Sequence, residues 1–384
     1  MPDARSLLAE HPIIDGHNDL PFALRKLVGY DLSRYDVGVR QSRTQTDLVR
    51  MVDGGVGGQF WSVFVPATWT SERAVAATLE QIDFVHRLVA AYPSRLALAL
   101  TAADVERAHA DGKIASLMGA EGGHSIASSL GVLRMLHRLG VRYLTLTHNS
   151  NVPWADAAND VPRLGGLSPF GRDVVHEMNR LGMLVDLSHT APGTMHDALE
   201  TTAAPVIFSH SCARALVDHP RNVPDEVLTA LATNGGVCMA AFVPAFVSTA
   251  FRDWAQDVNE DMRSRGEDDN DWEAFQAGMA RWAVQHPTPP VTVADVADHI
   301  EHIREVAGVE HVGIGGGYDG YGVMPSGLDD VSCYPALIAE LLDRGWSADD
   351  VAALTRGNVL RVLADAESVS AGSVSAGSVS VADG

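Results

Sequence analysis

Residues 183–210 read MLVDLSHTAPGTMHDALETTAAPVIFSH, and this stretch contains the repeating unit of the fold. Two short apolar runs, 183–189 and 205–210, flank an amphipathic segment, and each run ends in a histidine. Short and nearly continuous apolar runs are typical of strands that are buried on both faces. The stretch is therefore predicted to form a strand, a helix and a second strand parallel to the first.

Apolar runs of this kind occur eight times along the chain. The other six are 12–19, 57–65, 113–122, 142–148, 235–243 and 311–317. Segments with helical spacing lie between and after the runs, at 71–92, 168–182, 223–236, 292–308 and 347–366. Eight alternations of strand and helix predict an α/β fold, a (β/α)8 TIM barrel. A doubly wound open sheet is the competing fold, but no GxGxxG motif follows the first run.

Two segments fall outside the repeat. Residues 244–291 are acidic and rich in tryptophan, and we expect a helical insertion on the active-site side, as a lid or a subunit contact. Residues 367–384 repeat S-V-S-A-G and have almost no bulky side chains, so they cannot bury enough surface to offset the entropy of ordering. One barrel domain over residues 1–366, followed by a flexible tail, is therefore predicted.

The composition indicates a globular protein without nucleic-acid or membrane partners. The chain has 384 residues, of which 46% are hydrophobic and 20% charged, and a formal net charge of −21. That charge argues against a nucleic acid or an anionic membrane as the main partner. The three cysteines form no CxxC pair, no segment approaches the roughly 20 apolar residues of a membrane span, and the N-terminus has no signal-peptide core. We therefore expect a cytoplasmic protein.

Metal-binding side chains occupy the ends of the predicted strands. In a barrel of this kind the functional residues lie at the C-terminal ends of the strands. Those ends carry His17, Asp19, Glu121, His148, His189 and His210. Histidine and carboxylate are the natural ligands of zinc and related ions. A single such histidine is more often a packed or capped residue, but their repetition at one rim predicts a metal centre.

The ligand set is larger than one ion needs. His17 and Asp19 are two residues apart on a strand, so both side chains can reach one ion. Five ligands exceed the three that a catalytic zinc usually takes from protein, and a carboxylate such as Glu121 can bridge two ions. The lysines, Lys26 and Lys113, do not lie at strand C-termini, which excludes a modified lysine as the bridge. Two zinc ions are therefore predicted.

Seven ordered motifs resemble the membrane (renal) dipeptidase family of zinc metallopeptidases. They are IIDGHNDLP (13–21), GGVGGQFWSVFVP (54–66), GAEGGHSI (119–126), LTLTHNSNVPWADA (144–157), LVDLSHT (184–190), VIFSHSCARAL (206–216) and RNVPDEVL (221–228). The similarity runs from about residue 12 to residue 363, without the secretion signal and lipid anchor of renal members, as in the soluble bacterial members. The resemblance implies a binuclear zinc barrel that hydrolyses dipeptides, tolerates a D-residue at the C-terminal position and often forms homodimers.

The resemblance also implies roles for individual residues. The implied ligands are His17 and Asp19 on one ion, His189 and His210 on the other, and Glu121 between them. His148 resembles the family histidine that polarises the scissile carbonyl and steadies the oxyanion. Arg221 resembles the arginine that holds the free carboxylate of the substrate, and its planar fork suits a bidentate contact of this kind.

The segment HVGIGGGYDG (311–320) departs from the family pattern G-I-G-x-D-F/Y-D-G, because Gly317 replaces the first aspartate. In the family this aspartate is the general acid–base, a role that glycine cannot fill. Asp319 remains, and on an extended strand it would face the same side as residue 317. Loss of acid–base help is expected to cost about 10²–10⁴-fold in rate. The sequence therefore predicts an impaired dipeptidase whose metal site is largely intact.

Other functions remain open at this point. The chain could be a non-catalytic peptide-binding relative, or a substrate-trapping variant in which Gly317 was introduced. A different barrel hydrolase, such as an esterase or a phosphotriesterase, is the third alternative. Arg221 and the missing bridging lysine argue against that alternative.

Overall fold

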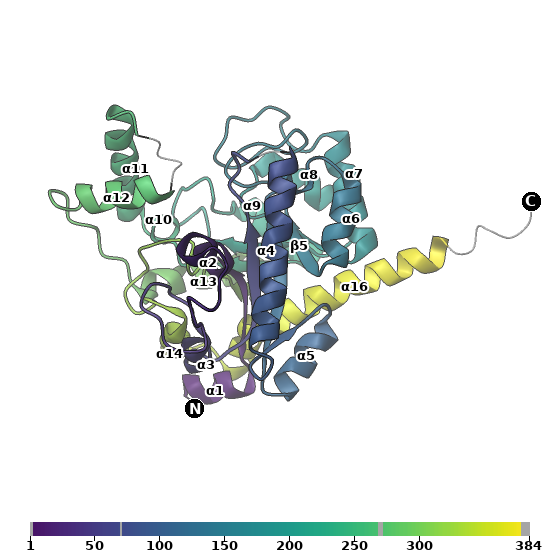
Figure 1. Ribbon diagram of the computed structural model, residues 1–384, viewed down its shortest axis with the longest axis horizontal. Helices are drawn as coiled ribbons and strands as arrows, with labels where there is room; N and C mark the ends of the chain where they lie inside the picture. The colour runs from purple at the N-terminus through teal and green to yellow at the C-terminus, as the bar shows by residue number, and fades with distance from the viewer. Residues whose placement is uncertain (1–2, 70, 268–271, 378–384) are drawn as a thin grey trace, which may run out of the picture.

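Parallel strands form a barrel at the centre of the molecule. The structure is a computed structural model that describes residues 3–69, 71–267 and 272–377 (Figure 1). The barrel strands are β1 (Ile13–Asn18), β2 (Val56–Phe64), β4 (Ile114–Glu121), β5 (Val141–Thr145), β6 (Leu184–Asp186), β7 (Ile207–Ser211), β8 (Val237–Ala240) and β9 (Val312–Ile314). They pair in this order, and a bridge between Asn18 and Tyr318 joins the first strand to the segment after the last. The predicted (β/α)8 barrel is confirmed.

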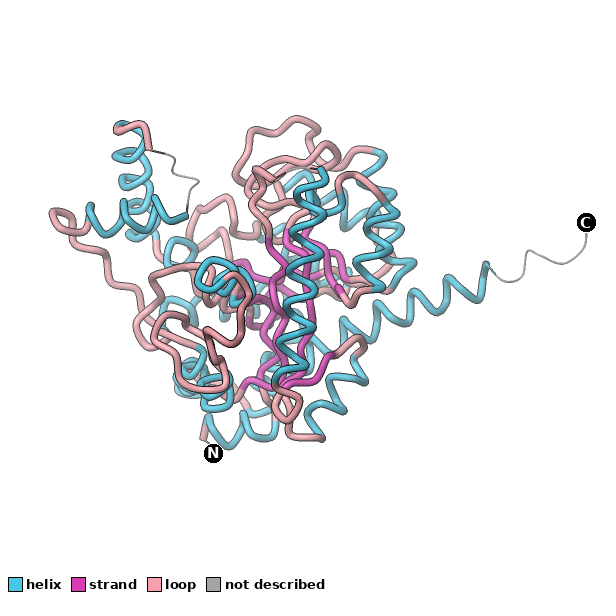
Figure 2. The backbone as a smooth tube through the Cα atoms, viewed as in Figure 1, coloured by secondary structure: helices cyan, strands magenta, loops and turns pink. Residues whose placement is uncertain are grey.

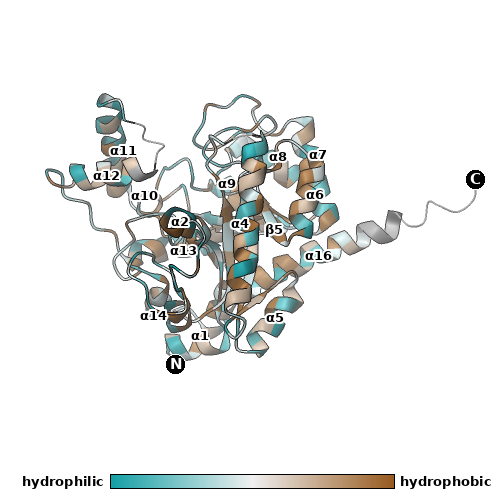
Figure 3. Cartoon of the chain, viewed as in Figure 1, coloured by the Kyte–Doolittle hydropathy of each residue, from teal (hydrophilic) through white to brown (hydrophobic). Residues whose placement is uncertain are grey.

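The strands are buried as the apolar runs predicted. Every residue of β1, β4 and β7 is buried. Figure 2 shows the strands at the centre with helices around them, and in Figure 3 apolar residues are concentrated along the strands behind α4 (Ser71–Ala91). Parallel strands covered by helices have no solvated face, which explains why the runs do not alternate between polar and apolar residues.

One short strand was not predicted. β3 (Leu96–Leu98) pairs with the first residues of β4, from Ile114 to Ser116. Its three residues are too few to produce a recognisable apolar run. Because it lies at the N-terminal end of β4, it has no part in the opposite rim, where the metal-binding side chains were predicted.

The helices outside the insertion surround the barrel. They are α1 (Ala4–Glu10), α2 (Leu20–Val28), α3 (Leu48–Asp53), α4, α5 (Ala102–Ala110), α6 (Leu130–Arg138), α7 (Pro169–Leu181), α8 (Pro192–Thr201), α9 (Asp225–Asn234), α13 (Val293–Ala307), α14 (Tyr334–Asp343), α15 (Ala348–Ala352) and α16 (Asn358–Gly377). Their ends follow local sequence signals. Ser168 caps α7 by accepting a hydrogen bond from the N–H of Gly171, and Gly182 ends that helix with a left-handed φ of 72°. None of the helices in the described ranges combines the length and hydropathy of a membrane span.

The segment 244–291 contains helices α10 (Pro244–Val247), α11 (Thr249–Ser264) and α12 (Trp272–Trp282). They project beside the barrel in Figure 1. The rings of Phe275 and Tyr321 lie 6.4 Å apart, and the Tyr321 hydroxyl donates to the sulfur of Met279 over 3.7 Å. The insertion therefore packs on the loop after β9, which leaves the barrel at the rim of the predicted site. Its role as a lid or a subunit contact remains a prediction.

The C-terminal helix runs past the predicted boundary. We expected a flexible tail from Glu367, but α16 remains helical to Gly377. Glu367 accepts a 2.8 Å hydrogen bond from the N–H of Ala102, and the Ser370 hydroxyl donates to the carbonyl of Arg180 over 2.8 Å. These contacts with the barrel helices explain the continued helix. The rest of the predicted tail, 378–384, lies outside the described residues.

Candidate active site

The carboxylate of Glu121, the last residue of β4, is the point on which the predicted ligands converge. Its Oε1 lies 3.1 Å from Nε2 of His189, 3.6 Å from Nε2 of His210 and 3.8 Å from Nε2 of His148. Its Oε2 lies 3.5 Å from Nε2 of His17. That same nitrogen lies 3.2 Å from Oδ2 of Asp19. The structure thus brings all six predicted metal-binding side chains to one place.

Five strand ends supply these residues, with Glu121 at the end of β4. His17 belongs to β1 and His210 to β7, and Asp19 directly follows β1. His148 and His189 each stand three residues beyond the last residue of their strand. Because parallel strands present their C-terminal ends at one rim, residues up to 193 positions apart in sequence become neighbours, as the span from His17 to His210 shows.

The donor set fits divalent cations. Two groups of three have all their ligand atoms within 4.8 Å of one another, namely His17, Glu121 and His210, and Glu121, His148 and His189. The two Nε2 atoms of His189 and His210 face each other at 3.0 Å. A cation accepts both lone pairs, whereas without one at least one nitrogen must carry a proton. The second group includes His148, which the family resemblance placed on the substrate rather than on an ion, and Asp19 lies outside both groups.

Burial favours the protonation states that a metal site needs. It lowers the pKa of His148, His189 and His210, which favours the neutral imidazole that can act as a ligand. It also raises the pKa of Glu121 to about 7, although the charge of His17 opposes this shift. A buried carboxylate among neutral imidazoles is costly unless positive charge accompanies it. The electrostatics of the cluster therefore suit bound cations.

A second layer of polar groups holds the predicted ligands in place. Nδ1 of His17 lies 3.1 Å from the Tyr143 hydroxyl, and the Ser62 hydroxyl donates to Oε2 of Glu121 over 3.0 Å. Nδ1 of His210 lies 2.9 Å from the Ser209 hydroxyl, and Nδ1 of His189 lies 3.2 Å from Oδ1 of Asn149. Such contacts orient ligand rings and set their tautomers. Sequence reasoning missed Ser62, Tyr143, Asn149 and Ser209, because no spacing signal marks them.

A buried carboxylate beneath the rim was also missed. Asp186, the last residue of β6, accepts hydrogen bonds from the hydroxyls of Thr145 (2.5 Å) and Ser209 (2.6 Å). It also accepts from the backbone N–H groups of Ser188 (3.1 Å) and Ser209 (2.8 Å). Asp186 thereby ties the ends of three neighbouring strands together. Its place in the run MLVDLSH, as a carboxylate amid apolar residues, was the available signal.

Arg221 is a buried cation beside the metal-binding cluster. Its side chain donates to the carbonyl of His210 over 3.3 Å and to the hydroxyl of Ser211 over 3.5 Å. Its Nε has no hydrogen-bond partner within the described residues, and its guanidinium carbon lies 5.2 Å from the ring centre of Phe246. Burial lowers its pKa to about 10, so the group stays charged at neutral pH. A buried guanidinium with spare donors suits a carboxylate ligand.

The segment after β9 differs from the predicted strand. The strand ends at Ile314, and both Gly317 and Asp319 have left-handed φ values, 70° and 65°. Side chains alternate only along an extended strand, so the reason for placing Asp319 on the same face as residue 317 does not hold. Asp319 is instead tied to Gln45, because its Oδ1 accepts from the Gln45 N–H at 2.7 Å and its own N–H donates to Oε1 of Gln45 at 2.7 Å.

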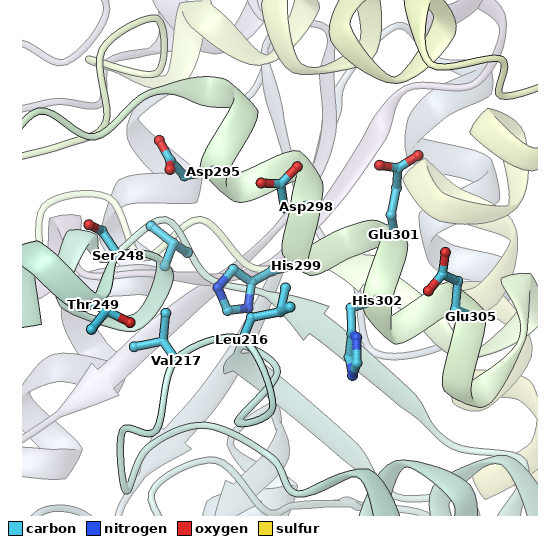
Figure 4. A pocket seen from close by; sticks show the side chains of 11 residues that line it. Leu216, Val217, Ser248, Thr249, Asp295, Asp298, His299, Glu301, His302 and Glu305 are labelled. Carbon is cyan, nitrogen blue, oxygen red and sulfur yellow. The ribbon is translucent and has the colours of Figure 1, made fainter.

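A pocket of about 450 Å³ against α13 is a different place on the molecule. In Figure 4 the carboxylates of Asp298 and Glu301 point away from the imidazoles of His299 and His302. Both carboxylates accept 2.6 Å hydrogen bonds from Arg344. These two carboxylates are thus already engaged by an arginine, and none of the predicted metal-binding residues lines the pocket.

The comparisons with known sequences point to one family. The family model for membrane dipeptidase, peptidase family M19, matches residues 1–376. Dipeptidase 3 of Mus musculus is 41% identical over 372 residues, which cover 95% of this chain and 66% of the mouse protein. An uncharacterized dipeptidase of Schizosaccharomyces pombe is 42% identical over 373 residues, which cover 94% of this chain and 82% of the yeast protein. The chain thus spans slightly less than two thirds of the mouse relative.

A solved structure shares the fold. It is a metallopeptidase from Rhodobacter sphaeroides, liganded with a phosphinate mimic of the dipeptide L-Ala-D-Ala. The TM-score is 0.77 at 24% identity, over 92% of this chain and 99% of the bacterial one. The parallel barrel, the cluster of histidines around Glu121 and the match along nearly the whole sequence lead to one conclusion: the chain belongs to the membrane dipeptidase family, peptidase family M19.

Proposed function

We propose that this protein is a dipeptidase that works with two zinc ions and is slowed by the glycine at position 317. The observation that carries the proposal is the convergence of His17, His189 and His210 on the buried carboxylate of Glu121. Two overlapping groups of ligand atoms that share this carboxylate favour two ions over one. Following the family resemblance, the proposed ligands are the five residues His17, Asp19, Glu121, His189 and His210, and His148 of the second group is assigned to the substrate.

The chemistry is divided between the ions and the chain. When bound, two divalent ions supply an activated water and polarise the carbonyl of the scissile bond. Arg221 holds the free C-terminal carboxylate of the dipeptide, since its guanidinium is charged, buried and short of acceptors. His148, whose Nε2 lies 3.8 Å from Glu121, is placed to donate to the carbonyl oxygen as negative charge develops there.

The substrates are dipeptides with an L-residue first and an L- or D-residue second. A guanidinium beside the metal-binding cluster would select for a free C-terminus close to the scissile bond. The bound L-Ala-D-Ala mimic in the Rhodobacter relative supports this class. Because the site recognises backbone groups, we expect the ends of the dipeptide to matter more than its side chains.

Proton transfer to the leaving nitrogen is the step of the proposed hydrolysis that this protein should catalyse poorly. A peptide bond breaks only when the leaving nitrogen receives a proton, and a positioned acid–base group contributes about 10²–10⁴-fold. Gly317 offers no such group. Asp319 has a pKa raised to about 7 by burial, but its Oδ1 accepts a hydrogen bond from the Gln45 N–H, which fastens the carboxylate to the loop before α3. Slow hydrolysis is the expected result.

The missing acid–base group at position 317 favours a second candidate function. A site that binds metals and a dipeptide carboxylate but lacks a proton carrier at Gly317 would act as a peptide-binding protein. The two candidates share the metal centre and differ only in turnover. Measured turnover therefore separates them.

For the localisation and oligomeric state of the protein, we propose a cytoplasmic homodimer without nucleic-acid or membrane partners. The net charge of −21 supports the lack of a nucleic-acid partner, and the family resemblance supports the dimer. The insertion 244–291 is the proposed subunit contact or lid. Light scattering coupled to size exclusion measures the mass in solution, and a monomer at micromolar concentration would contradict the dimer.

The experiment that tests the activity follows release of D-Ala from L-Ala-D-Ala. We expect slow hydrolysis by zinc-loaded protein, loss of hydrolysis after chelation, and recovery when zinc is restored. Glu121→Gln, which removes the shared charge at nearly constant volume, is the matched control and should be inactive. Hydrolysis that survives chelation would refute a metal-dependent reaction. Binding of the dipeptide without any turnover would establish the second candidate instead.

A further inference from the structure

The loop that follows β5, residues 147–159, contacts the ligand His189 at both its backbone and its ring. We propose that this loop sets the affinity for one of the two metal ions, with Thr147 and Asn149 as positioning residues. The inference rests on the proposed metal-dependent function, because it concerns how one of the ligands is held. It assigns a task to two residues outside the proposed set of ligands.

His189 adopts a backbone conformation that needs support. Its φ is 67°, in the left-handed region that residues with a side chain rarely occupy. It stands three residues after β6, so no strand pairing keeps it in place. Other contacts must therefore hold this ligand in position.

The 147–159 loop supplies those contacts at the backbone. The carbonyl of His189 accepts one hydrogen bond from the Thr147 hydroxyl at 3.0 Å and another from the Ala158 N–H at 2.7 Å. A bridge between Ala157 and Thr190 extends the contact by one residue. Thr147 is fully buried, so water cannot take the place of its hydroxyl.

The loop also orients the ring. Nδ1 of His189 lies 3.2 Å from Oδ1 of Asn149, and Nδ2 of Asn159 donates to that same oxygen over 3.2 Å. Because an amide oxygen only accepts, Nδ1 carries the hydrogen. The lone pair of Nε2 is then free on the side of Glu121 Oε1, which lies 3.1 Å away. This is the tautomer that a metal ligand needs.

The arrangement couples two parts of the site. Thr147 and Asn149 flank His148, which is proposed to donate to the substrate carbonyl, and the same loop fixes a proposed ligand that follows the neighbouring strand. A change that loosens the loop should therefore weaken metal binding before it unfolds the barrel. Outer contacts of this kind are worth about 10- to 100-fold in metal affinity.

The experiment titrates metal-free protein with Zn²⁺ in competition with a chromogenic chelator. We expect two ions for the unmodified chain. Thr147→Val, which removes the hydroxyl at constant shape, should weaken one of them by about 10- to 100-fold, while Thr147→Ser should keep both. Asn149→Ala should weaken the same ion, and Asn149→Asp, which retains the acceptor oxygen, should not. Asn149 is exposed, so its variants test the inference even if Thr147→Val fails to fold.

Two further measurements separate positioning from simple destabilisation. Thr78→Val removes a buried hydroxyl whose hydrogen bond goes to Ala74 within α4, not to a ligand or to the 147–159 loop, and should leave both zinc affinities unchanged. The visible spectrum of the Co²⁺-loaded protein should change for Asn149→Ala but not for Thr78→Val. Two tight ions in both Thr147→Val and Asn149→Ala would overturn this inference alone. An unmodified chain that binds no zinc would overturn it together with the proposed function.

Discussion

The N–H of Gly317 donates a 3.0 Å hydrogen bond to the carbonyl of His17. The residue that lacks a side chain is thus fastened to the backbone of a proposed metal ligand. A Cβ built at Gly317 would meet no heavy atom within 4 Å, so space exists there for a larger residue. Its φ of 70° is tolerated best by glycine, asparagine and aspartate.

We predict that Gly317→Asp raises kcat on dipeptides by at least about 10²-fold, the lower end of what acid–base catalysis supplies. The aspartate would accept the proton of the attacking water and return it to the leaving nitrogen. Because substrate binding is assigned to Arg221 and the metal site, which the substitution leaves in place, KM should change less than kcat. Steady-state hydrolysis of L-Ala-D-Ala measures both constants.

Gly317→Asn is the matched control for that variant. It has the same shape and tolerates the same φ but cannot transfer a proton, so it should stay as slow as the unmodified chain. If instead the unmodified chain already works at ordinary dipeptidase rates and Asp319→Asn abolishes the activity, Asp319 is the proton carrier and Gly317 is not the cause of any impairment.

A second prediction concerns the substrate carboxylate. Amidation of the C-terminus of the dipeptide removes the charge that Arg221 is proposed to bind, and should weaken binding strongly. Arg221→Ala should abolish most of the difference between acid and amide, and Arg221→Lys should retain part of it, because a lysine makes no bidentate contact. Calorimetry on zinc-loaded protein measures these affinities. Equal affinity of the unmodified chain for acid and amide would remove Arg221 from the substrate site.

A third prediction concerns packing beneath the metal centre. A Cβ at Gly119 in β4 would lie 1.9 Å from the ring of Tyr143, whose hydroxyl contacts His17. Gly119→Ala should therefore destabilise the protein by about 1–3 kcal/mol and reduce zinc affinity. Gly131→Ala in α6, where the nearest neighbour is 3.4 Å away, is the control and should be neutral or stabilising. Urea unfolding measures the free energy of unfolding of both variants. Equal free energies for Gly119→Ala and the unmodified chain would refute the predicted clash.

A fourth prediction concerns pH. His299 is buried in α13, and its Nδ1 accepts from the N–H of Ala213 at 3.0 Å. Burial lowers its pKa to about 4, below the value of about 6.5 expected in the unfolded chain. The unfolded state therefore binds the proton first, and stability present above pH 6.5 is lost as the pH falls toward 4, by roughly 2–4 kcal/mol.

His299→Asn tests that assignment, because its side-chain oxygen can replace Nδ1 as the acceptor without titrating. Unfolding of metal-free protein should depend less on pH between 4 and 6.5 in the variant than in the unmodified chain. Identical pH profiles would show that His299 does not contribute.

The strand ends were predictable, whereas the turns beyond them were not. The apolar runs placed His17, Glu121 and His210 at one rim because burial on both faces leaves a local signal in the sequence. The conformation of His189 depends on the N–H of Ala158, and that of Gly317 on the carbonyl of His17, and such distant contacts leave no local pattern. Residues 367–377 are helical for the same kind of reason, since α16 packs on α7 and α5.

The most direct test of the central claim is the number of zinc ions per chain. Elemental analysis of protein purified with zinc and then desalted should find close to two ions in the unmodified chain. Glu121→Gln should bind clearly fewer, because the shared carboxylate contributes to both groups of ligands. A single ion in the unmodified chain, with Glu121→Gln unchanged, would contradict the two-metal site on which the proposed function rests.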